Sequence, residues 1–249
     1  MEQSSSLPVS TLSCQNCNTA VSHRYCPQCG QPVELKRIDA HYIHHEITHI
    51  LHFENGILYT IKELLLRPGQ NVRTFLTVNR SRLVKPIVFI IITSLIYTLI
   101  SHFFHIEEGY VKIEDSKGLS TNAINDWVQN HYGYSNIIMG LFIAFWLKIL
   151  FIKSPYNLFE ILILLCFVLG MGMLMFSIAA LAEGLIKLKL LSIFGVIYLV
   201  YASWAVGQFF NSKKISAYLK AFSAYILGML TFSAIIYMLT LVADLLIKH

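Results

Sequence analysis

The sequence predicts an all-α polytopic membrane protein with about five transmembrane helices, a small N-terminal four-cysteine zinc ribbon and an amphipathic cytoplasmic arm between them. Two observations predict this fold class. Of the 249 residues, 55% are hydrophobic and only 13% are charged, whereas soluble domains carry about a quarter charged residues. In addition, four of the five cysteines fall within sixteen residues near the N-terminus.

Residues 1–13 are Ser-rich and lack periodicity, so we expect a flexible tail with no cleavable signal peptide. Residues 14–32 hold two cysteine pairs, Cys14 with Cys17 and Cys26 with Cys29. Two residues separate the members of each pair, which is the spacing that lets two thiolates of one turn reach a single ion. The pattern therefore predicts zinc. The fifth cysteine, Cys166, lies in an apolar run and is expected to be a small buried hydrophobe.

Four thiolates fill a tetrahedral zinc shell, so the metal is expected to be structural and to catalyse nothing. Modules of this kind bind proteins, bind nucleic acids or only stabilise the fold of the chain. The nearby basic residues are Arg24, Lys36 and Arg37, too few for a nucleic-acid surface. The ribbon is therefore expected to contact a protein on the cytoplasmic side.

Residues 38–85 form a His-rich, amphipathic arm expected at the membrane interface. Within it, His45-Glu46-Ile47-Thr48-His49 fits the pattern in which two histidines bind zinc and a glutamate activates water. A peptidase also needs a third ligand, for which Glu63 and Glu160 are candidates. The alternatives are a non-catalytic second metal or proton-sensing site, and a polar helix face at the headgroups. The sequence does not favour an enzyme, and Glu46 is the catalytic residue of the alternative only.

The second half of the arm, residues 56–69, predicts a short amphipathic helix that ends at Pro68-Gly69. Its apolar face is expected to comprise Ile57, Leu58, Ile61, Leu64 and Leu65. About ten residues cannot span a bilayer, so the helix lies in the interface or packs under the spans. The basic stretch from Arg73 to Lys85 is expected to follow anionic headgroups.

Residues 86–249 alternate long apolar runs with short polar breaks and form the membrane domain. The expected spans are about 86–104, 134–153, 158–182, 190–210 and 222–247. Cations precede the first span and separate the second from the third and the fourth from the fifth. By the positive-inside rule, the N-terminus is cytoplasmic and the C-terminus lies outside.

Two ionisable residues near the cytoplasmic ends of adjacent spans, Lys148 and Glu160, are candidates for an intramembrane pair. Such a pair is the main support for a second alternative function, a small transporter. Lysine snorkelling and a boundary glutamate explain the same residues without transport.

The ribbon, the HHE-x-x-H stretch, the G-x-L-Y-T-x-K-E-L-L-x-R-P-G run and the basic link into Pro86 together resemble a family of bacterial membrane proteins of unknown function. In that family a zinc ribbon precedes a membrane region, and the arm is a domain of unknown function. The membrane region more loosely resembles the Yip-type five-helix proteins. The resemblance implies a bacterial inner membrane and supplies no catalytic residue.

These observations together favour a non-enzymatic scaffold or regulatory protein of the inner membrane, with the zinc ribbon as its docking module. Its expected partners are membrane lipids and a cytoplasmic protein. A homo-oligomer remains open.

Overall fold

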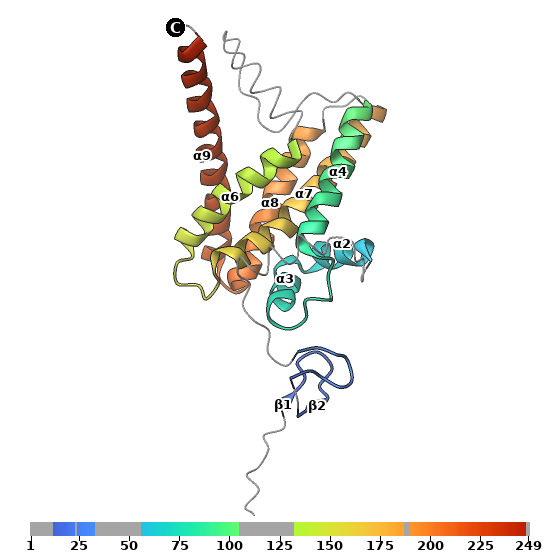
Figure 1. Cartoon of the computed structure of the whole chain (residues 1–249). Helices are drawn as coiled ribbons and strands as arrows, with labels where there is room; N and C mark the ends of the chain where they lie inside the picture. The colour runs from blue at the N-terminus through green and yellow to red at the C-terminus, as the bar shows by residue number, and fades with distance from the viewer. Residues whose placement is uncertain (1–11, 23, 33–55, 105–131, 187–189, 248–249) are drawn as a thin grey trace, which may run out of the picture.

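The computed structural model describes residues 12–22, 24–32, 56–104, 132–186 and 190–247 (Figure 1). A two-stranded antiparallel sheet lies at the N-terminal end, with Leu12 opposite Val21 and Ser13 opposite Ala20. Its strands are β1 (Leu12–Ser13) and β2 (Ala20–Val21). The helices are α2 (Ile57–Leu66), α3 (Pro68–Thr77), α4 (Pro86–Phe104), α6 (Tyr132–Leu150), α7 (Leu158–Ile186), α8 (Leu191–Asn211) and α9 (Ile215–Ile247).

Four helices in the described part of the chain are long and apolar enough to cross a membrane: α4, α7, α8 and residues 215–242 of α9. The protein is thus a multi-pass membrane protein by length and composition. The apolar stretch of α6, Ser135–Leu150, is shorter, so a fifth span is a proposal to which we return below.

Helix α7 lies at the centre of the bundle, in contact with α4, α6 and α8. It is apolar on every side, and a helix with no polar face is stable only where neighbours or lipid cover it all round. Phe167 of α7 is fully buried and meets Phe75 of α3 and Phe89 of α4, with ring centroids 5.5 and 5.8 Å apart. The core therefore joins the arm to the membrane helices.

Helix α9 begins at Ile215, before the predicted start at 222. The charge of Lys220 suggests a boundary in the sequence, but Ala217 and Ala221 are buried on the same side of the helix. Those two small side chains let the first turns of α9 pack against the bundle. Farther along, α9 leans away from α8 toward the C-terminus (Figure 1).

The short helices α2 and α3 cross the end of the bundle at which α4, α7 and α9 begin, and we call this end the base (Figure 1). Val72 and Phe75 of α3 are fully buried, as is Leu64 of α2 apart from 1% of its surface. The second half of the arm thus packs under the spans.

Candidate metal centre and the base of the bundle

The four ribbon cysteines sit on two loops of the same design. In the first loop the Cys14 amide donates to Thr19 O and the Asn18 amide donates to Cys14 O, both at 2.8 Å. The second loop repeats this with the Cys26 amide on Gln31 O at 2.8 Å and the Gly30 amide on Cys26 O at 2.9 Å.

In each loop the residue after the second cysteine has a positive φ, 59° at Asn18 and 70° at Gly30. Asn and Gly are the residues that tolerate this conformation best. Each Cys-x-x-Cys-Asn/Gly sequence therefore folds locally into a turn that directs two thiols to one side.

The two turns bring all four sulfurs together. The Sγ atoms of Cys14, Cys17, Cys26 and Cys29 lie within 4.8 Å of one another. The closest pairs are Cys17–Cys26 at 3.5 Å and Cys14–Cys29 and Cys17–Cys29 at 3.6 Å. Four sulfurs about 2.3 Å from a tetrahedral zinc lie about 3.8 Å apart, so this cluster can hold a metal ion of that size.

The four thiols differ in environment. Cys14 and Cys26 are buried, whereas Cys17 and Cys29 are exposed. A hydrogen bond with the Thr19 hydroxyl lowers the pKa of Cys17 to about 6, and burial raises the pKa of Cys26 to about 11. A buried thiol with a raised pKa, such as that of Cys26, becomes a thiolate readily only when a cation binds beside it.

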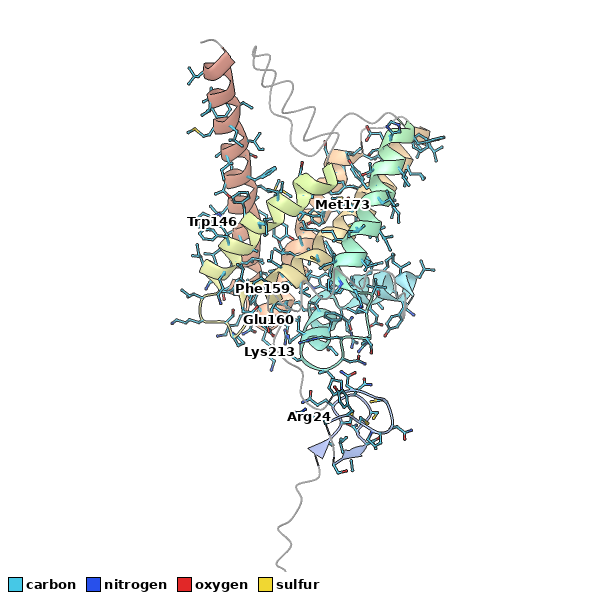
Figure 2. The ribbon with its side chains drawn as sticks, in the orientation of Figure 1. Arg24, Trp146, Phe159, Glu160, Met173 and Lys213 are labelled. Atoms are coloured by element: carbon cyan, nitrogen blue, oxygen red, sulfur yellow. The ribbon has the colours of Figure 1, made fainter. Side chains whose placement is uncertain are left out.

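Two hydrogen bonds connect the ribbon to the loop between α3 and α4. The Gln31 side chain donates from Nε2 to Val78 O at 2.7 Å, and Asn79 Nδ2 donates to Asn16 Oδ1 at 2.9 Å. Both ribbon residues lie beside a metal-site cysteine pair or its closing turn. The ribbon therefore rests on the base (Figure 2).

Helix α3 is joined to the end of α8 by a reciprocal exchange of hydrogen bonds. Gln208 Oε1 accepts from the amides of Gly69 at 2.8 Å and Gln70 at 3.3 Å, the first free N–H groups of α3. In return, Arg73 Nη2 donates to Gln208 O at 2.6 Å and to Phe209 O at 2.8 Å, among the last carbonyls of α8. Each helix thus provides hydrogen-bond partners for free backbone groups at one end of the other helix.

Helix α2 is fixed by Thr60 and Glu63. The Val84 amide donates to the buried Thr60 hydroxyl at 3.0 Å, and Arg82 forms an ion pair with Glu63 at 2.7 Å. The buried side of α2 therefore contains Thr60 and Leu64, whereas Leu58 and Leu65 of the predicted apolar face are exposed.

Lys148 and Glu160 both bind backbone of the loop that joins α6 to α7. Lys148 Nζ donates to Tyr156 O at 2.8 Å. Glu160 Oε2 accepts from the Asn157 amide at 2.8 Å, while Asn157 Oδ1 accepts from the Glu160 amide at 2.9 Å. This reciprocal cap starts α7 at the base, where Figure 2 labels Glu160.

The predicted second metal site, His45 with His49 and the catalytic alternative Glu46, lies outside the described residues. Its two candidate third ligands are described: Glu63 pairs with Arg82 and Glu160 caps α7. Sequence reasoning missed the bonding roles of Arg73, Gln208 and Asn79. Asn79 and Asn16 are 63 positions apart in the chain, and Arg73 and Gln208 are 135 positions apart.

The apolar helices and the cysteine cluster define the class: a multi-pass membrane protein whose four N-terminal cysteines can hold a metal ion. A family model described as "Protein of unknown function (DUF3667)" matches residues 54–98. This match covers α2, α3 and most of α4, and thus the arm resembles a domain-of-unknown-function family. No curated protein and no solved structure matched the chain.

Proposed function

We propose that this chain is a non-enzymatic scaffold or regulatory protein of the bacterial inner membrane, in which a structural zinc ribbon docks a cytoplasmic protein. The observation that carries the proposal is the attachment of the ribbon to the base by Gln31 and Asn79. A ribbon held in this way presents a fixed surface at the membrane, whereas a freely tethered ribbon does not.

Zinc is the metal that suits four thiolates in a closed tetrahedral shell. The sulfur separations of 3.5 and 3.6 Å support it. Such a shell leaves no coordination position for a substrate, which supports a structural role.

Two observations support five spans and a cytoplasmic base: the apolar helices alternate in direction, and many cations lie at the base. The apolar helices α4, α6, α7, α8 and α9 alternate in direction (Figure 1). Cations of the segments at the base include Lys62, Arg67, Arg73, Arg80, Arg82, Lys85, Lys153, Lys213, Lys214 and Lys220. The positive-inside rule places such an end in the cytoplasm, which puts the N-terminus inside and the C-terminus outside.

The surface offered to a partner includes Arg24 and Tyr25, which precede the second cysteine pair. Tyr25 is 63% exposed although its backbone is bridged to Pro32. Arg and Tyr are enriched among the residues that dominate protein–protein binding energies. A rigid backbone beneath an exposed tyrosine lowers the entropy lost on binding.

Partner capture tests docking. The full-length protein is crosslinked in its native membrane, and the recovered protein is identified by mass spectrometry. We expect the variant Y25A and the double variant C14S/C17S to lose a partner that both Q15A and C166S retain. Q15A is a matched change at another exposed ribbon residue, and C166S removes the cysteine outside the cluster. Equal recovery of that partner by all four variants would contradict docking.

Metal analysis separates the scaffold from the metallopeptidase alternative. We expect about one zinc per purified chain, lost in C14S/C17S and retained in C166S and in H45A/H49A. A second zinc that disappears in H45A/H49A would instead favour a peptidase site at His45, Glu46 and His49.

A further inference from the structure

A cavity of about 530 Å³ lies among α6, α7, α8 and α9, away from the ribbon and the base. Each of three helices contributes a methionine to its wall, Met139 from α6, Met173 from α7 and Met229 from α9. Figure 2 labels Met173 among the upper turns of the bundle. The volume falls in the range of about 300–1,000 Å³ that small-molecule sites occupy.

The lining determines what can fill this space. If a cavity of this size is empty, the atoms of its walls lack dispersion contacts on the side that faces the cavity. Methionine, leucine and glycine make up most of this wall, and its polar side chains are those of Asn136, Ser192, Tyr198 and Tyr225. Water alone would leave the apolar majority of the wall without a matching partner. An apolar ligand would restore these dispersion contacts, and the flexible methionine side chains can adapt to its shape.

One of the polar side chains in this wall, that of Asn136, has unused hydrogen-bonding capacity. The half-buried amide of Asn136 donates to Met173 Sδ at 3.6 Å, and a thioether is a weak acceptor. The described part of the chain provides its side chain with no other hydrogen-bond partner. An amide inside an apolar bundle gains most from a ligand carbonyl or hydroxyl.

The cavity opens to the side of α8. Val196 lines it and is 65% exposed, whereas Tyr198, also in the wall, is 5% exposed. Helix α9 leans away from α8 in this half of the bundle (Figure 1). Because α8 is long and apolar enough to cross a membrane, an opening on this side of α8 would face lipid.

We propose that the cavity binds an amphiphile taken laterally from the membrane, with its apolar chain between the methionines and one uncharged carbonyl or hydroxyl on Asn136. The part of the ligand inside the cavity is uncharged, because none of the described residues that line the cavity is charged. A charged headgroup would stay outside the opening, so a phospholipid chain with its ester carbonyl and a free long-chain alcohol share the required chemistry.

Photolabelling of the full-length protein in vesicles tests the proposal. The probes are a phosphatidylglycerol and a long-chain alcohol, each with a photoreactive diazirine in its chain. The variant V196W narrows the opening, and V200W is its matched control, because Val200 is also 65% exposed on α8 but does not line the cavity. We expect V196W to reduce labelling of peptides bearing Met139, Met173 or Met229 at least about fivefold, and V200W to leave it unchanged.

The variant N136L supplies a second readout, since leucine has a similar size but cannot hydrogen-bond. We expect it to reduce labelling at least about threefold while the helix content by circular dichroism stays that of the wild type. Labelling by the lipid alone or by the alcohol alone would support the proposal and identify the source. Equal labelling in V196W and V200W, or no labelling of the cavity by either probe, would overturn it.

Discussion

At the scale of single residues, two cations at the base, Arg73 and Lys220, bind backbone carbonyls at the ends of neighbouring helices. The sequence places Arg73 in a basic stretch expected to follow lipid headgroups, but its guanidinium donates to Gln208 O and Phe209 O. Lys220 similarly donates to Leu150 O at 3.0 Å, at the end of α6. A cation at a helix C-terminus satisfies free carbonyls and the helix dipole together.

Replacing Arg73 should therefore destabilise the bundle more than replacing a cation that lacks such contacts. We expect R73A to lower the free energy of unfolding by about 2 kcal/mol, because two carbonyls lose a charged donor. Its control is R67A, at an exposed arginine between α2 and α3. Denaturant unfolding in detergent measures both. A loss in R67A as large as that in R73A would contradict a specific capping role.

At the scale of elements, α3 depends on the absence of a side chain at Gly69. A Cβ built there would collide with backbone atoms of α8, Phe209 N and Ala205 O. Backbone cannot rotate aside as a side chain can, so this close approach requires glycine. Gly69 lies within the segment that the family model matches.

The variant G69A should displace α3 from α8 and cost about 1–3 kcal/mol, the usual range for overpacking. Gly56 is the matched control, because a Cβ built there has nothing within 4 Å. We expect limited proteolysis to cut the α2–α3 segment faster in G69A than in G56A or the wild type. Unchanged proteolysis in G69A would show that α8 yields to the extra methyl group.

At the scale of the whole molecule, the described part of the chain has two hydrophobic cores. Cys14, Val21 and Cys26 form the small core of the ribbon, separate from the large core that α7 organises. The side-chain hydrogen bonds of Gln31 and Asn79 join the two parts. A three-residue core is too small to fold the ribbon by itself, and a metal bound by the four cysteines would supply the missing stability.

Removing the metal should unfold the ribbon and leave the bundle intact. We expect a chelator to make residues 12–32 sensitive to protease while the melting temperature of the helices, followed by circular dichroism at 222 nm, changes by less than about 3 °C. C166S is the control that keeps the metal. A helical melting temperature that falls much further would mean that the ribbon also supports the bundle.

The sequence by itself determined the features that depend on local chemistry. Cysteine spacing located the cluster that can hold a metal ion, because each pair needs only its own turn. Hydropathy located the apolar helices, because lipid excludes charge along a whole run. The bounds of α4 agree with the first predicted span. Proline and glycine at 68 and 69 marked where α2 ends.

Only the tertiary structure decided where those elements meet. It paired Arg73 with the end of α8, and it opened a cavity beside Asn136. Hydropathy reports that a helix is apolar but not which neighbour covers each side. Contacts between residues more than a hundred positions apart depend on how the helices pack, and packing is a property of all the side chains together.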